Sequence, residues 1–182
     1  MQNKPNLVFK IAFFWVFLSL TGMGQEVDST RKVLDLSKQR LTQLPEEVFR
    51  YPNLEVLILK KNKIQSLPDS GWEKLPHLRY IDLSRNKLSY LPSAWGQLPI
   101  DTLILNRNFI LRIPDSFQNM DELIYLDLWS NEVDRLPEKM NDLPRLKLID
   151  MRGISMNHKY RAEFLNQFPK IEILVSPGCD CK

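Results

Sequence analysis

The strongest constraint on the fold of this chain is a motif that recurs about every 23 residues. Copies begin at Leu54, Leu78, Ile100 and Leu123, so successive starts are 24, 22 and 23 residues apart. The last copy, residues 123–137, reads LIYLDLWSNEVDRLP, and every copy ends on Leu-Pro or Ile-Pro. A unit this short cannot bury its own apolar side chains, so stacked units must share one core. The spacing therefore predicts a solenoid.

Apolar and polar residues alternate in the first part of each copy, which predicts a short strand. In the last copy, Leu126 and Leu128 would face one side of the strand. Tyr125, Asp127 and Trp129 would face the other side. We therefore expect a sheet with one buried face and one face open to solvent.

The chain must return between strands, and apolar residues there recur as pairs three positions apart. This spacing places both side chains on the same side of a tight helical turn, toward the core. A proline precedes each turn and fits the first helical position, which needs no amide hydrogen. The pairs are Val48 and Tyr51, Trp72 and Leu75, Trp95 and Leu98, Phe117 and Met120, and Met140 and Leu143, after Pro45, Pro68, Pro92, Pro114 and Pro137.

An asparagine follows each of four strands, at Asn62, Asn86, Asn108 and Asn131. A carboxamide carries both donors and an acceptor, so it can bond backbone groups that no sheet ladder satisfies. We expect each asparagine to bond the backbone of its own turn and of the next coil. The four residues would then form a structural asparagine ladder.

The pattern LxxLxLxxNxL in these copies resembles the leucine-rich repeat family, and the resemblance covers nearly all of the chain after residue 30. It implies an α/β fold, a leucine-rich-repeat solenoid or horseshoe. One parallel sheet would line the concave side, and short helical or 3-10 turns would form the convex side. The resemblance also implies a recognition module rather than an enzyme.

The ends of the predicted repeat domain, residues 31–176, depart from the template as capping repeats do. At the N-terminal cap, Arg31 replaces the first apolar residue and Gln39 replaces the asparagine. After Leu146 the pattern decays, and Ile154 stands where the asparagine is expected. An amphipathic helix over 158–167 and a strand over 171–175 would form the C-terminal cap. This ending resembles short secreted bacterial leucine-rich repeat proteins of the Bacteroidetes type.

Residues 1–24 have the layout of a signal peptide, with Lys4 and Lys10 before or beside the apolar run 11–20. Small residues near the end of this segment predict cleavage between Gly24 and Gln25. An uncleaved anchor is the alternative, but the apolar segment is shorter than the roughly 20 residues that span a membrane. We expect no membrane span in the mature chain, a polar lead-in over 25–30, and a secreted, periplasmic or cell-surface location.

The tail, residues 177–182, contains both cysteines, Cys179 and Cys181. Three interpretations stay open for an exported protein: pairing with another molecule or surface, a strained local disulfide, and a metal or redox site. The sequence does not choose among them.

Composition and motifs exclude several functions. The sequence has a formal charge of +3 and no basic block, so we expect the charge to be evenly spread and expect no nucleic-acid partner. Asp127 and Asp150 on adjacent strands could share a cation, but Ile104 interrupts their column and Arg152 can neutralise them, so we expect no metal. No HExxH, Gly-rich phosphate loop or paired catalytic carboxylate motif is present, so we expect no cofactor and no catalytic residue.

The open face of the sheet is the expected binding surface. Six strands about 4.8 Å apart give a strip roughly 25–30 Å long, which suits a protein segment better than a metabolite. Aromatic and arginine side chains dominate binding at protein interfaces. The candidate contact residues on the concave face are Tyr80, Asp82, Ile104, Arg107, Tyr125, Asp127, Trp129, Asp150 and Arg152.

Other interpretations of this face remain. Its residues could be ordinary sheet formers that stabilise the strands. A surface glycan is an alternative ligand to a protein. The chain as a whole could instead be a secreted effector, an enzyme-associated repeat protein, or a structural surface protein without a specific partner.

Overall fold

The computed structural model describes residues 28–156 and 158–177. The predicted signal peptide, its cleavage site at Gly24 and Gln25, and both cysteines of the tail lie outside these residues. None of the described helices is both long and apolar enough to cross a membrane.

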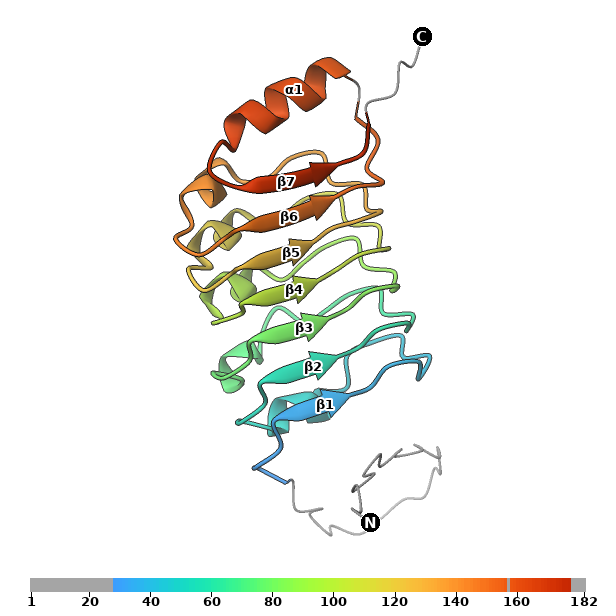
Figure 1. Ribbon diagram of the computed structural model, residues 1–182. Coiled ribbons are helices and arrows are strands. Elements are labelled where there is room, and N and C mark those ends of the chain that lie inside the picture. The colour runs from blue at the N-terminus through green and yellow to red at the C-terminus, as the bar shows by residue number, and fades with distance from the viewer. Residues whose placement is uncertain (1–27, 157, 178–182) are drawn as a thin grey trace, which may run out of the picture.

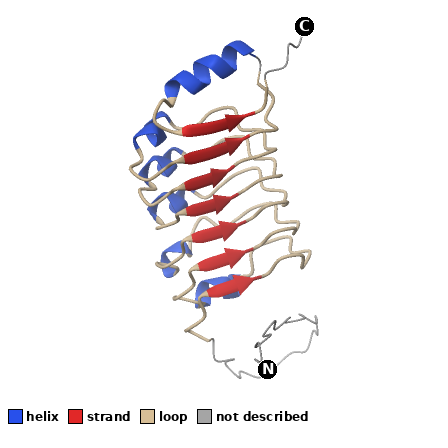
Figure 2. Cartoon of the chain, viewed as in Figure 1, coloured by secondary structure: helices blue, strands red, loops and turns tan. Residues whose placement is uncertain are grey.

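Seven parallel strands form one sheet in which the strand order equals the sequence order (Figure 1). Each strand has three or four residues, and short helices lie on the other side of the coils (Figure 2). This confirms the predicted α/β solenoid. The strands are β1 (Val33–Asp35), β2 (Val56–Ile58), β3 (Tyr80–Asp82), β4 (Thr102–Ile104), β5 (Tyr125–Asp127), β6 (Leu148–Met151) and β7 (Glu172–Val175).

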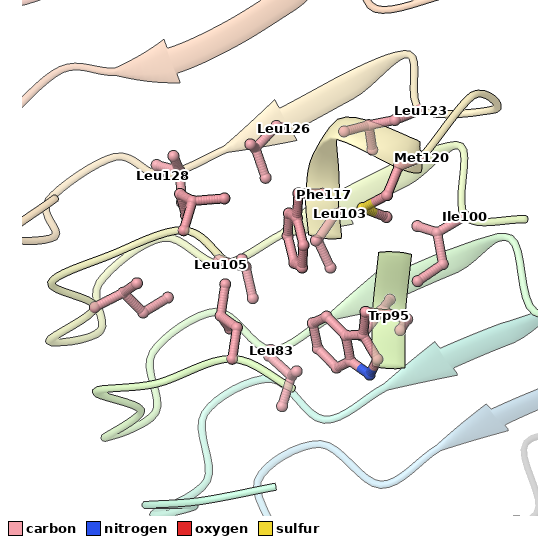
Figure 3. Packing of buried hydrophobic residues seen from close by; sticks show 14 of the residues in the cluster. Leu83, Trp95, Ile100, Leu103, Leu105, Phe117, Met120, Leu123, Leu126 and Leu128 are labelled. Carbon is pink, nitrogen blue, oxygen red and sulfur yellow. The ribbon is translucent and has the colours of Figure 1, made fainter. Parts of the chain in front are cut away.

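The core is one continuous column between the strands and the returning segments. The second residue of each of the first six strands is buried, as alternation requires. Figure 3 shows leucines from successive coils packed against Trp95 and Phe117. The rings of Trp72 and Trp95 meet edge to face with centroids 5.1 Å apart, so the two tryptophans are packing residues of the core.

Each of the first five coils returns through a 3-10 helix. The first residue of each predicted apolar pair lies in the helix and the second follows it directly. Nine of these ten side chains are buried, and Tyr51 is partly exposed. The helices are η1 (Glu46–Arg50), η2 (Trp72–Lys74), η3 (Ser93–Gln97), η4 (Asp115–Asn119) and η5 (Glu138–Asp142).

Four of the five prolines lie one position earlier than predicted. They precede the first helical residue, with φ between −59° and −63°, a value that the pyrrolidine ring fixes. Pro68 is different, because the second coil has one more residue between the proline and the apolar pair. Gly71, at φ +96°, precedes helix η2 instead, and the indole Nε1 of Trp72 donates to the carbonyl of Pro68 at 2.7 Å.

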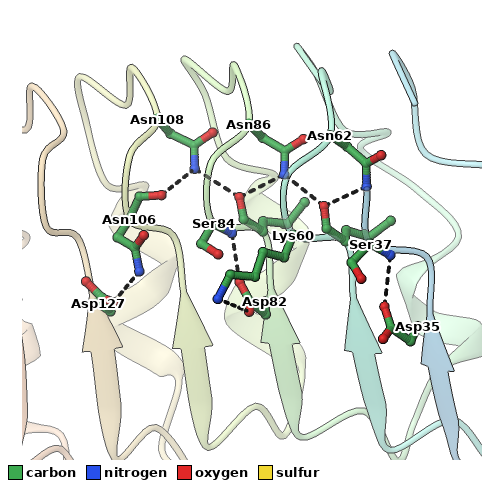
Figure 4. A network of polar contacts seen from close by, with 12 residues as sticks. Asp35, Ser37, Lys60, Asn62, Asp82, Ser84, Asn86, Asn106, Asn108 and Asp127 are labelled. Carbon is green, nitrogen blue, oxygen red and sulfur yellow. Dashed lines mark hydrogen bonds and ion pairs between the residues drawn. The ribbon is translucent and has the colours of Figure 1, made fainter. Parts of the chain in front are cut away.

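The asparagines form a chain of hydrogen bonds across the coils (Figure 4). The Nδ2 of Asn108 donates to the carbonyls of Leu105 in its own coil, at 2.8 Å, and Leu83 in the preceding coil, at 3.1 Å. Its Oδ1 accepts from the amide of Leu88, at 3.0 Å. Asn62, Asn86 and Asn131 repeat this arrangement. The partner coil is therefore the preceding one, not the next one as we expected.

The C-terminal end of the solenoid is closed by helix α1 (His158–Gln167) and strand β7. Phe164 and Phe168 are buried, with ring centroids 5.4 Å apart. Ile154, in place of an asparagine, is buried as well. The repeat thus ends by exchanging a polar ladder residue for an apolar one and covering the last coil with a helix.

Candidate functional site

The register of the sheet places the predicted contact residues in columns on its open face. Tyr80 pairs with Thr102 and Thr102 with Tyr125, while Asp82, Ile104 and Asp127 form the neighbouring column. Asp127 pairs with Asp150 on the next strand. The residues therefore share one surface, but Tyr80 and Asp82 on β3 lie two strands away from Tyr125 on β5.

The aspartates of this face hold the turns after their strands. In Asp82, Asp127 and Asp150, Oδ1 accepts the backbone amide two residues further on, at 2.8–3.0 Å. All three side chains are buried, with 9% or less of their surface exposed. A short carboxylate that caps its own turn in this way is an Asx turn. These side chains therefore fix the turns beneath the open face and project little from it.

A shallow hollow of about 390 Å³ opens on the face between β5 and β6. Two aromatic side chains, two carboxylates and one guanidinium line it. These residues are Tyr125, Asp127, Trp129, Asp150 and Arg152. Five of the nine predicted contact residues thus come together, whereas Tyr80, Asp82 and Ile104 lie outside the hollow, as does Arg107, which contacts Trp129.

Trp129 is held from two sides. The guanidinium carbon of Arg107, one coil earlier, lies 4.4 Å from the centroid of the indole ring. Gly153, one coil later, lies so close that a Cβ there would come within 3.1 Å of the indole Nε1. The indole remains partly exposed. The ring is thus fixed in place while part of its surface stays open to a ligand.

The two carboxylates in the hollow have different electrostatic surroundings. Arg152 binds Asp150 with two parallel bonds, Nε to Oδ1 at 3.0 Å and Nη2 to Oδ2 at 2.6 Å. Burial raises the pKa of Asp150, but the side-chain and backbone hydrogen bonds from Arg152 outweigh burial and leave the pKa below its ordinary value.

Asp127 lacks such a cation. Its Oδ2 accepts from Nδ2 of Asn106 at 2.5 Å, and in the described part of the chain no lysine or arginine forms an ion pair with it. Burial therefore raises the pKa of Asp127, although its hydrogen bonds with Asn106 and with the amide of Trp129 partly oppose that shift.

Burial and the nearby aspartates also shift the pKa values of the two tyrosines. Burial raises the pKa of Tyr125, and the charges of Asp127 and Asp150 raise it further. Burial and the charge of Asp82 likewise raise the pKa of Tyr80. Both hydroxyls are therefore neutral at physiological pH and can act as hydrogen-bond donors.

The described residues contain no group of three or more His, Cys, Asp or Glu side chains placed to hold a metal ion. Asp127 and Asp150 lie side by side on the adjacent strands β5 and β6. Asp127 is bonded to Asn106, and Asp150 is bonded to Arg152. The hollow presents the rings of Tyr125 and Trp129, the carboxylate of Asp127, which has no ion pair with a described residue, and the guanidinium that Asp150 holds in place. This arrangement suits contact with another molecule.

Sequence reasoning missed three features of this region. The repeat pattern predicted neither the hydrogen bond from Asn106 to Asp127 nor the close approach of Gly153 to Trp129. The expectation that basic residues are evenly spread was wrong: they gather in the turns after β1 to β4. Aligning the positions on either side of each ladder asparagine would have revealed that gathering.

Comparisons with known proteins agree with the repeat pattern. Residues 32–88 match the leucine-rich repeat family. The chain is 34% identical over 112 residues to mouse leucine-rich repeat and calponin homology domain-containing protein 1, covering 62% of this chain and 16% of that protein. It is 31% identical over 149 residues to human PH domain leucine-rich repeat-containing protein phosphatase 1, covering 79% of this chain and 9% of that protein.

A solved structure is similar as well. A leucine-rich repeat protein of Leptospira interrogans superposes with a TM-score of 0.73 at 28% identity, over 80% of this chain and 37% of that one. The chain spans less than a fifth of the mouse and human relatives, so the likeness concerns the repeats. The motif, the sequential parallel sheet and these likenesses together support assignment of the chain to the leucine-rich repeat family, with the fold of a leucine-rich-repeat solenoid.

Proposed function

We propose that this chain is an exported, non-catalytic recognition module that binds a protein partner through the open face of its sheet. Leucine-rich repeats generally mediate contacts between proteins, which supports the general class. The single observation that carries the choice of surface is the hollow that Tyr125 and Trp129 line.

Trp129 is the central residue of this proposal. Two contacts fix its ring, and yet part of the ring remains exposed. A rigid aromatic side chain loses little conformational entropy on binding, which is why tryptophan and tyrosine are frequent hot spots at interfaces. Tyr125 adds a neutral hydroxyl, and Arg152 is oriented by Asp150. The hollow is therefore preorganised for a partner side chain.

A double substitution tests the proposal. Tyr125→Ala with Trp129→Ala should abolish capture of a partner from the native envelope and culture medium, without lowering the melting temperature by more than a few degrees. The matched control is Lys74→Ala with Asn119→Ala, two exposed residues in helices η2 and η4. Proteins identified by mass spectrometry should bind the original chain and the control but not the double variant.

Two outcomes would count against this use of the face. Capture of the same proteins by the double variant would show that the hollow is not the binding site. Capture that survives protease digestion of the extract would indicate a glycan instead of a protein.

Export rests on the sequence of the first 24 residues, where basic residues precede an apolar run and small residues precede Gln25. N-terminal sequencing of the protein recovered from cell envelope or medium should begin at Gln25. A recovered chain that begins at Met1 would overturn this part of the proposal.

A further inference from the structure

Basic side chains gather along one flank of the solenoid, in the turns that follow β1 to β4. In the first three turns they lie immediately before and immediately after Gln39 or the ladder asparagine, and in the fourth turn only Arg107, before Asn108, is basic. All are exposed. We call this set the basic flank: Lys38, Arg40, Lys61, Lys63, Arg85, Lys87 and Arg107.

Backbone hydrogen bonds align the first of these positions into a row. The amide of Lys61 donates to the carbonyl of Ser84 at 2.9 Å, and that of Arg85 to the carbonyl of Asn106 at 2.8 Å. Lys38 and Arg107 make equivalent bonds at either end of the row. The four cations therefore follow the strand spacing of about 4.8 Å and span roughly 14 Å.

The backbone at these four positions is left-handed, with φ between 56° and 59°. This conformation is uncommon for residues that carry a side chain, and glycine adopts it most easily. The chain nevertheless has lysine or arginine at every one of the four.

The four turns that carry the basic flank have no acidic residue of their own, and the first acidic residues at equivalent positions, Glu132 and Asp134, come one coil later. The segments 37–44, 60–67, 84–91 and 106–113, which form these turns, contain no Asp or Glu. None of the seven side chains belongs to an ion pair in the described part of the chain, although Lys32 and Lys170 elsewhere pair with Glu55 and Asp142. A row of like charges at this spacing favours an anionic ligand.

Exposed apolar side chains adjoin the basic flank at its C-terminal end. Phe109 continues the row of Lys63 and Lys87, because its amide donates to the carbonyl of Leu88 at 2.8 Å. The exposed fraction of its side chain is 55%, and that of Leu111 is 42%. The ligand that fits this flank thus has anionic groups with an apolar group beside them.

We propose that the basic flank binds an acidic segment of a protein partner, with aspartate or glutamate side chains across Lys61, Arg85 and Arg107 and an apolar side chain against Phe109. Arginine and lysine rows recognise acidic motifs through charge-assisted hydrogen bonds. The basic flank adjoins the hollow where Arg107 contacts Trp129 but supplies none of the residues that line it, so it adds a second contact region to the proposed function.

Two features favour a polypeptide over other polyanions. A sulfated polysaccharide offers anions without apolar side chains for Phe109 and Leu111. A bilayer is flat, whereas the row passes from the flank onto the sheet face, since Arg107 stacks on Trp129. An extended acidic segment of about four residues covers the roughly 14 Å of the row and can follow it around that edge.

The test measures binding of the full mature chain to a synthetic peptide of about eight residues, rich in Asp and Glu with one Phe, by isothermal calorimetry. Lys61→Glu with Arg85→Glu should weaken binding about tenfold or more, because repulsion replaces attraction. Lys74→Glu with Lys139→Glu is the control, with the same change of net charge at exposed residues in helices η2 and η5.

Further measurements separate this surface from the hollow. Phe109→Ala should remove the preference for the peptide with Phe over one without it. Tyr125→Ala, which changes the hollow and keeps the contact between Arg107 and Trp129, should bind the peptide as the original chain does. Salt should weaken binding severalfold, because exposed charges are screened within about 8 Å at physiological ionic strength.

Three outcomes would overturn the proposal. The first is no measurable binding of the peptide. The second is equal binding by the charge-reversed and control variants. The third is binding of an oligonucleotide, a sulfated polysaccharide or phosphatidylglycerol vesicles that the peptide does not displace. Normal peptide binding by a chain whose hollow captures no partner would refute the proposed function and leave this inference standing.

Discussion

Arg107 and Trp129 contact each other twice, although they belong to neighbouring coils. The guanidinium carbon of Arg107 lies 4.4 Å from the centroid of the indole ring, and the backbone amide of Arg107 donates to the carbonyl of Trp129 at 2.8 Å. The backbone bond fixes the register of the two coils, and the cation–π contact fixes the ring. The same residue thus ends the cationic row and orders one wall of the hollow.

Arg107→Ala should loosen the indole of Trp129. We expect the fraction of tryptophan fluorescence that acrylamide quenches to rise, because Trp72 and Trp95 are buried and only Trp129 becomes more accessible. The free energy of unfolding should fall by about 0.5–1 kcal/mol, the usual strength of an exposed cation–π contact. Arg112→Ala, an exposed arginine further along the same turn, is the control. Equal quenching in both variants would show that Arg107 does not hold the ring.

Asn108→Ala should lower the free energy of unfolding by about 1–3 kcal/mol, because it leaves the buried amide of Leu88 without a partner and removes one of the two asparagine hydrogen bonds to each of the carbonyls of Leu83 and Leu105. Urea denaturation followed by circular dichroism measures the loss. Asn119→Ala, at an exposed position in helix η4, should leave stability unchanged within about 0.5 kcal/mol. An Asn108 variant as stable as the control would contradict the role of the ladder.

Asp127 and Asp150 should change stability with pH in opposite directions. The folded pKa of Asp127 is raised by burial, so the folded state binds this proton more readily than the unfolded state. The free energy of unfolding therefore falls as pH rises from the ordinary value of 3.8 through the raised one. Asp127→Asn should remove that fall and gain stability relative to the original chain at neutral pH.

For Asp150 the sign is reversed. Burial alone would raise its pKa, but the bonds from Arg152 lower it, so the contribution of Asp150 to stability is present above 3.8 and is lost as pH falls through the lowered pKa. Asp150→Asn should remove this loss and be less stable than the original chain at neutral pH. Urea denaturation between about pH 3 and pH 7 measures both effects, with Asp121→Asn as an exposed control. The same pH profile in all variants would refute the assignment.

Gly96→Ala should push the neighbouring helices η3 and η4 apart. A Cβ at Gly96 would lie against the carbonyl oxygen of Ser116 and within 2.7 Å of its carbonyl carbon, so helices η3 and η4 would have to move apart. We expect a loss of about 1–3 kcal/mol in the free energy of unfolding, the usual effect of overpacking. Gln97→Ala, at the exposed neighbouring position, should cost little. A melting temperature that Gly96→Ala leaves unchanged would show that this contact can relax.

The sequence predicted the scaffold because the scaffold is periodic. The spacing of leucines, the asparagines and the apolar pairs each follows from one repeated geometry, so the strands, the 3-10 helices and the core could be placed residue by residue. The error at Pro68 arose where the second coil has one extra residue and Gly71 takes over the start of the helix. A periodic template places residues poorly in any coil whose length differs from that of the other coils.

The candidate site was less predictable, because it depends on contacts between coils. Alternation correctly placed Asp127 in an outward column, but its burial comes from the Asx turn and the bond from Asn106. Trp129 was recognised as an outward residue, whereas its fixation depends on Arg107 one coil earlier and Gly153 one coil later. The gathering of cations was missed because residues such as Lys61 and Arg85 are 24 positions apart in the chain and become adjacent only after coiling.

The strictly sequential order of the strands has a consequence for how such a protein can change length. A strand such as β4 pairs only with β3 and β5, so an added or deleted coil alters two junctions and leaves every other contact intact. An inserted coil with its own asparagine would find the same carbonyl acceptors in the coil before it. The length of the open face can therefore change by duplication or loss of coils, while its side chains change independently by substitution.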